Sequence, residues 1–114
     1  MKISLYEPTR SLANFHIAGF AHHDGWRVFS ELKVGTKLEL RCEPGNPHDP
    51  EAIAIYYGET KIGYVPSANN NEFYTYLFYG HEDLFEIFIT TVDDDAHPER
   101  QFRVVVTLSD KRDA

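Results

Sequence analysis

Histidine and carboxylate side chains cluster in two short stretches of the chain. His22, His23 and Asp24 are adjacent, and His48 and Asp49 stand inside a turn cluster rich in proline. Imidazole nitrogens and carboxylate oxygens are common zinc ligands. If the two stretches converge in the fold, His22, His23, His48 and Asp49 could ligate zinc, although their spacing matches no standard zinc motif.

The same side chains also suit nucleic-acid recognition. Imidazole and phenol rings stack on unpaired bases, while histidine, lysine and backbone N–H groups bind phosphates. Asp49 would be repelled by phosphate, but its carboxylate could accept a hydrogen bond from a sugar hydroxyl. That role favours the end of a nucleic-acid chain over a continuous backbone. Binding is expected to strengthen as the pH falls toward 6, because imidazolium attracts phosphate.

The turn cluster that holds Asn46, His48 and Asp49 is strongly constrained. It spans residues 43–50 with the sequence E-P-G-N-P-H-D-P, which contains three prolines and one glycine. Because proline fixes its own φ angle, the polar side chains have little freedom left to lose on binding. A pre-organised binding loop and a purely structural turn both fit this composition, which is common between strands.

Six segments alternate apolar and polar residues, as β-strands do. They are residues 14–20, 36–42, 52–57, 61–65, 84–92 and 102–108. The third and fourth are separated by Gly58-Glu59-Thr60 and are expected to form a hairpin. The pattern predicts a mostly β fold with a minor α component, built as a small, curled, mainly antiparallel sheet or barrel.

Two short helices complete the expected elements. Apolar residues at positions 26, 28, 29 and 32 predict a helix over residues 26–32 with Asp24 as its N-cap. Asn69 and Glu72 resemble a capping box before an aromatic helix over residues 73–79, which Gly80 ends. The aromatic side chains of this helix are expected in the core, with a base-stacking platform as the alternative.

Composition limits the class of protein. The chain has 114 residues, of which 42% are hydrophobic, and we expect residues 1–114 to form one domain with its own core. Cys42 is the single cysteine, which excludes an internal disulfide framework and a cysteine-based zinc finger. No run of about 18 apolar residues and no signal peptide occurs, so we expect a cytoplasmic protein that makes no use of membranes.

The acidic excess of the chain is local. The formal net charge is -7, and residues 82–99 alone contain seven acidic residues with no Lys or Arg. This segment is expected to be a solvated edge. A cation site at Asp93, Asp94 and Asp95 is the alternative, although the spacing of a calcium loop is absent. Elsewhere 11 acidic residues balance 11 basic ones, so another face could be basic.

No catalytic motif was found. The sequence contains no nucleophile elbow, no phosphate-cradling glycine loop and no H-E-x-x-H helix. The serines occur in no such context either. We therefore expect a protein without enzymatic activity.

Five motifs in order resemble the HIRAN domain over about residues 14–110. They are F-H-I-A-G-F at 15–20, H-D-G at 23–25, L-E-L-R at 38–41, E-P-G-N-P-H-D-P-E-A-I-A-I at 43–55 and K-I-G-Y-V-P at 61–66. The resemblance implies a six-stranded, OB- or SH3-like antiparallel β-barrel with small helices. In eukaryotes such domains accompany Snf2-type ATPases of replication-fork repair, where they grip the 3′-hydroxyl end of single-stranded DNA. Bacteria carry free-standing versions, which this chain resembles because no helicase motifs accompany it.

The resemblance also implies roles for individual residues. His22 and His23 occupy the positions of stacking aromatics, and His48 replaces the tyrosine of N-P-Y-D. Asp49 matches the carboxylate that receives the terminal hydroxyl, and Tyr64 lies at a pocket position. The predicted nucleic-acid-binding residues are His22, His23, Asn46, His48, Asp49, Lys61 and Tyr64.

Three hypotheses follow for function. The leading one is a non-catalytic module that binds single-stranded DNA 3′ ends in repair or replication, with a helicase or nuclease as a possible protein partner. Ala21 and Ser67 stand where DNA-binding members of the family carry basic residues. These differences and the acidic segment motivate an alternative, a protein-interaction module that has lost DNA binding. A zinc-dependent hydrolase is the third hypothesis; apart from zinc in that case, no cofactor is expected.

Overall fold

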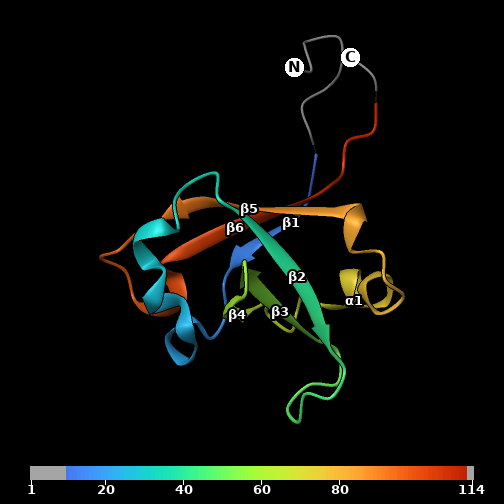
Figure 1. The fold of residues 1–114 in the computed structure, drawn as a ribbon, viewed down its shortest axis with the longest axis horizontal. Helices are drawn as coiled ribbons and strands as arrows, with labels where there is room; N and C mark the ends of the chain where they lie inside the picture. Colours follow the sequence, from blue (N-terminus) through green and yellow to red (C-terminus); the bar gives the residue numbers. More distant parts are fainter. Residues whose placement is uncertain (1–9, 113–114) are drawn as a thin grey trace.

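The structure, a computed structural model, describes residues 10–112. Six strands form one curled sheet in the order β1-β6-β5-β2-β3-β4, and every neighbouring pair is antiparallel (Figure 1). The strands are β1 (Ser11–His16), β2 (Lys37–Glu43), β3 (Ala52–Tyr57), β4 (Thr60–Tyr64), β5 (Phe85–Val92) and β6 (Phe102–Leu108). The predicted mostly β, six-stranded antiparallel fold is confirmed.

The two edges of the sheet meet just after β1. Ala18 and Tyr64 exchange two backbone hydrogen bonds, with N···O distances of 2.9 and 2.8 Å. Gly63 permits this approach, because a Cβ atom there would lie 2.6 Å from the Ala18 carbonyl oxygen and would also clash with the Ile17 side chain. The glycine of the K-I-G-Y motif thus allows the sheet to close on itself.

The core fills the inside of this curled sheet. Its most buried side chains come from β3, β4 and β6, and α1 (Asn71–Phe78) closes the remaining opening with Phe73 and Leu77. Side chains with no solvent exposure include Ile53, Ile55, Ile62, Val104 and Val106. The predicted strands at 36–42, 84–92 and 102–108 and the hairpin at 52–65 are confirmed within two residues at each end.

The helix predicted over residues 26–32 is wrong. This region forms three short 3-10 turns, at Phe20–His22, Asp24–Arg27 and Phe29–Glu31. Asp24 caps nothing with its side chain, and Trp26 is 66% exposed. Phe20 and Phe29 instead pack on Phe102 of β6, with ring centroids 4.8 and 5.2 Å away. These long-range ring contacts come from two separate 3-10 turns and fix the local backbone more strongly than the helical spacing of residues 26–32 does.

The strand predicted at 14–20 ends early. Gly19 adopts a positive φ of 69°, so the chain turns and Phe20 enters the core on the face where alternation had placed Gly19. The aromatic helix is confirmed, but its N-cap is Asn70 and not Asn69, and the Asn70 side chain makes no capping hydrogen bond to the first turn of the helix. Its aromatic side chains were expected in the core, and this holds for only some of them. Phe73 is buried, while Tyr76, Phe78 and Tyr79 are at least half exposed.

No helix in residues 10–112 is both long enough and apolar enough to cross a bilayer.

Candidate nucleic-acid interface

The loop at residues 43–50 is held by the side chain of Asn46. Asn46 Oδ1 accepts hydrogen bonds from the backbone N–H groups of His48 and Asp49, at 2.8 and 3.1 Å. Asn46 N also donates to the Glu43 carbonyl oxygen at 3.0 Å. The asparagine oxygen is therefore used within the loop, where it fixes the position of Asp49.

Asp49 itself is held at both carboxylate oxygens. Oδ1 accepts a hydrogen bond from Glu51 N at 2.9 Å, and Oδ2 accepts one from Asn70 Nδ2 at 2.8 Å. Asn70 is only 4% exposed and belongs to the start of α1. Since each carboxylate oxygen offers two acceptor positions, Asp49 keeps capacity for one more donor on each oxygen.

A hydrogen-bonded cluster forms beside the loop, where the end of β2 approaches β4. The Tyr64 hydroxyl donates to Glu43 Oε1 at 2.8 Å and accepts from Lys61 Nζ at 3.0 Å and from Asn46 Nδ2 at 3.4 Å. Lys61 also forms an ion pair with Glu43. All four side chains are partly buried, so this cluster connects the loop rigidly to the closing edge of the sheet.

The cluster changes the acidity of its members. Partial burial disfavours the charged form of Glu43, but hydrogen bonds from Lys61, Tyr64 and Asn46 outweigh it and lower the pKa of the carboxyl. Burial likewise opposes the charge of Lys61, but its hydrogen bonds to Glu43 and Tyr64 prevail and raise the pKa of the ammonium group. Both groups therefore remain charged at neutral pH.

His23 extends the cluster with a second ring. Its centroid lies 5.2 Å from that of Tyr64 at an interplanar angle of 66°. Partial burial lowers the pKa of His23, and the positive charge of Lys61 lowers it further. At pH 6, His23 is therefore less charged than a free imidazole would be, which weakens the contribution expected of it to phosphate binding.

We call His23, Lys61, Tyr64 and the loop at 43–50 the loop site. Of the seven residues predicted to bind nucleic acid, the hydrogen bonds and ring contacts above join His23, Asn46, Asp49, Lys61 and Tyr64. His22 and His48 are exposed, and neither side chain makes a hydrogen bond, ion pair or ring contact within the described part of the chain.

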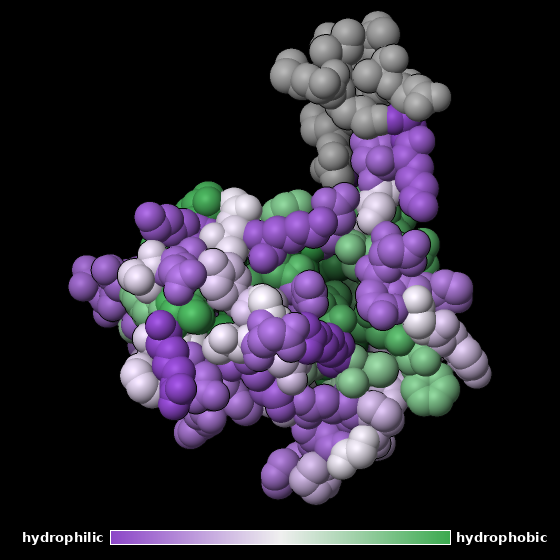
Figure 2. All heavy atoms as spheres, in the orientation of Figure 1, coloured by the Kyte–Doolittle hydropathy of each residue, from purple (hydrophilic) through white to green (hydrophobic). Residues whose placement is uncertain are grey.

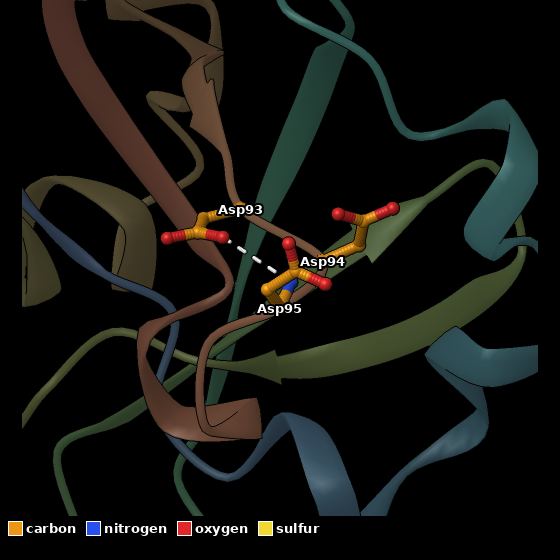
Figure 3. Close-up of side chains that lie close together, drawn as sticks. All are labelled: Asp93, Asp94 and Asp95. Atoms are coloured by element: carbon orange, nitrogen blue, oxygen red, sulfur yellow. Dashed lines mark hydrogen bonds between the residues drawn. The ribbon is translucent and has the colours of Figure 1, made fainter.

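The predicted zinc ligands do not come together. Among residues 10–112, the one group of three or more histidine, cysteine or acidic side chains with clustered ligand atoms is Asp93, Asp94 and Asp95. His22, His23, His48 and Asp49 therefore form no such group, and the geometry gives the zinc-dependent hydrolase no support. In the aspartate turn, Asp93 Oδ1 accepts a hydrogen bond from Asp95 N at 3.2 Å, and all three side chains are exposed (Figure 3).

The sequence does not identify two residues that shape the loop site, Glu43 and Asn70. Glu43 stands in the turn cluster, although it continues the outward alternation of Glu39 and Arg41. Asn70 lay inside the predicted capping box, and no local pattern indicates that it reaches Asp49. That pairing is separated by 21 positions and arises only when α1 docks against the loop.

Similar solved structures share this fold. A protein from Lactobacillus plantarum matches with a TM-score of 0.72 and 20% identity, over 89% of this chain and 95% of that one. The HIRAN domain of human HLTF matches with a TM-score of 0.60 and 13% identity, over 87% of this chain and 76% of that one. No curated protein sequence matches the chain.

A comparison of the sequence with protein families identifies the family of the chain. A model of the HIRAN domain matches residues 11–109, which include all six strands and the whole loop site. The resemblance of the E-P-x-N-P-x-D and K-I-G-Y motifs agrees with this match. The chain belongs to the HIRAN domain family.

Proposed function

We propose that this domain binds single-stranded DNA at a 3′ end through the loop site. The observation that carries the proposal is the grouping of two rings, one ammonium group and one fixed carboxylate where the sheet closes. An unpaired base needs a ring to stack on, a phosphate needs a cation, and a terminal sugar hydroxyl needs an acceptor. The loop site offers one group for each task.

Each residue then has a defined role. Tyr64 and His23 provide surfaces for a terminal base, and Lys61 contacts the phosphate. Asp49 accepts the hydrogen bond of the 3′-hydroxyl, while His22 and His48 extend the stacking surface on either side. The carboxylate makes the site selective, because a 3′-phosphate would place negative charge against Asp49.

The rival function is a protein-interaction module without DNA binding, serving a partner such as a helicase or nuclease. One observation favours it. Lys61 is already paired with Glu43, so a phosphate must compete with that carboxylate for the cation. Ala21 and Ser67 are exposed and uncharged, so they add no compensating charge.

Titration of a 5′-labelled single-stranded oligonucleotide at low salt separates the two functions. We expect binding to the wild type and a loss of about three- to tenfold for Lys61→Gln, since one phosphate contact disappears. Lys37→Gln is the matched control, because it removes the same charge from an exposed position on β2. Equal affinities for the two variants would contradict the proposed site, and no binding by the wild type would favour the rival.

A further inference from the structure

β2 and β5 separate after a short contact. Their ladder consists of Lys37 with Phe88 and Leu38 with Ile87, and two backbone hydrogen bonds join Gly35 and Thr36, just before β2, to Ile89. Beyond that point β2 pairs with β3, and the start of β5 pairs with β6 (Figure 1). The facing edges of the two strands therefore carry backbone N–H and C=O groups without a ladder partner in the described part of the chain. Such edges are templates for the addition of another strand.

A groove occupies the space between the separating strands. Its volume is about 600 Å³, and its apolar lining includes Leu38, Leu40 and Ile87, which are 2–5% exposed. Figure 2 shows apolar atoms deep in this face between hydrophilic side chains. We call this feature the β2–β5 groove. It combines an apolar floor with two open strand edges, which is the arrangement used for extended peptides.

The rim of the groove is acidic. Its charged lining consists of Glu39, Glu82, Asp83, Glu86, Lys37 and Arg41. Both basic side chains are already paired, since Lys37 lies 3.9 Å from Glu86 and Arg41 lies 3.1 Å from Glu39.

Glu82 and Asp83, by contrast, are not paired with a basic side chain in the described part of the chain. Within residues 10–112, no Lys, Arg or His side chain lies within ion-pair distance of either one. The excess of carboxylates gives the groove negative charge that repels nucleic acid and attracts cationic side chains.

We propose that the β2–β5 groove binds an extended, lysine- or arginine-rich segment of a partner protein by strand addition. About four to six residues of the segment pair with an open edge, at about 3.3 Å per residue. Alternate side chains then point to the rim, where cations meet Glu82 and Asp83. A second copy of this chain is a poor occupant. The edge strand β1 contains no Lys or Arg, and the one lysine of the other edge strand, Lys61 of β4, is already paired with Glu43. The proposal does not depend on DNA binding at the loop site.

A labelled octapeptide of alternating lysine and valine is the direct probe. We expect it to bind at low salt and to shift the backbone amide resonances of Leu40 and Glu86. Replacement of its lysines by glutamate should abolish binding, and N-methylation of alternate peptide nitrogens should weaken it, because donors to the strand edge are lost.

A charge-matched pair of variants tests the location. Glu82→Gln with Asp83→Asn should weaken peptide binding by about fivefold or more. Asp94→Asn with Asp95→Asn makes the same change in net charge at the opposite end of β5 and should leave the affinity unchanged. Equal losses in both pairs, the absence of peptide binding by the wild type, or amide shifts confined to the loop site would overturn the proposal.

Discussion

The loop site and the β2–β5 groove both lie along β2, but their polar groups differ. Those of the loop site are paired with one another, and several of those in the groove are not. At the loop site, which follows the end of β2, Glu43, Lys61 and Tyr64 satisfy one another by hydrogen bonds. In the groove, beside the first half of β2, the strand edges have no ladder partner and Glu82 and Asp83 no ion-pair partner among residues 10–112.

If both proposals hold, the difference implies two kinds of recognition. A ligand at the loop site meets pre-organised groups and must compete with existing partners, so geometry determines selectivity. A ligand at the groove supplies missing partners, so charge and backbone pairing determine affinity. Weakening the internal contacts of the loop site should therefore affect both stability and ligand discrimination, whereas changes of charge at the groove rim should affect binding alone.

Gly63→Ala should have the largest effect, because it breaks the closure that supports the loop site. The added methyl would meet the Ala18 carbonyl oxygen and the Ile17 side chain. We expect a loss of about 3 kcal/mol or more in the free energy of unfolding, measured by urea denaturation. Gly45→Ala is the control, since a Cβ atom there has no neighbour within 4 Å. Similar stabilities of the two variants would show that the closure is not tight.

Tyr64→Phe tests whether the cluster at the loop site acts as a unit. It removes a hydroxyl that makes hydrogen bonds to Glu43, Lys61 and Asn46, and we expect a loss of about 1–2 kcal/mol in the free energy of unfolding. Tyr57→Phe removes a hydroxyl that makes one exposed hydrogen bond, to Glu31, and keeps the partly buried ring, so it should change stability little. Equal effects of the two changes would argue against a cooperative cluster.

Asn70→Ala tests whether the position of the Asp49 carboxylate matters, because it removes a hydrogen bond to this carboxylate without removing the carboxylate itself. It removes the hydrogen bond to Asp49 Oδ2, and we expect a loss of about 1 kcal/mol in stability, measured by thermal denaturation. The carboxylate remains, so nucleic acid should still bind, but with less discrimination between 3′ ends. Asn71→Ala, at an exposed position on α1, should preserve both properties. Unchanged discrimination in Asn70→Ala would show that this contact does not position the acceptor.

Acid titration gives the smallest expected effect. The pKa of Glu43 in the folded state lies below its ordinary value of 4.5, so the unfolded chain takes up this proton at a higher pH than the folded one. Its stabilising contribution is therefore complete above about pH 4.5 and is lost as the pH falls through the folded pKa. In Glu43→Gln the decline of stability in this range should be shallower than in the wild type. Parallel declines would contradict the lowered pKa.

Local patterns predicted most of the strands. They did not predict the contact of Ala18 with Tyr64, or how residues 20–32 pack on the sheet. Alternation identified five strands well, because one side of each faces the core. Alternation placed the first strand at 14–20 instead of Ser11–His16, and helical spacing failed at residues 26–32, where Phe29 packs on Phe102, some 70 positions away in sequence. Helical spacing over two turns cannot be distinguished from successive 3-10 turns when such contacts decide the backbone.

The sequence predicted which residues form the loop site, but it did not predict the hydrogen bonds and the ion pair that join them. The motifs E-P-x-N-P-x-D and K-I-G-Y indicated Asp49, Lys61 and Tyr64, yet the pairing of Lys61 with Glu43 depends on the approach of β2 and β4. Asn70 reaches Asp49 only through the docking of α1. Side chains that support a site from a distant element carry no local signal.

The most direct test of the central claim compares two oligonucleotides of identical sequence that end in a 3′-hydroxyl or a 3′-phosphate. Fluorescence anisotropy should show tighter binding of the hydroxyl end by the wild type, by about tenfold, because Asp49 accepts one hydrogen bond and repels the added phosphate. Asp49→Ala should lose that preference while Lys61 still contacts the backbone. Equal affinity of the wild type for the two ends, or a preference that persists in Asp49→Ala, would contradict end recognition by this carboxylate.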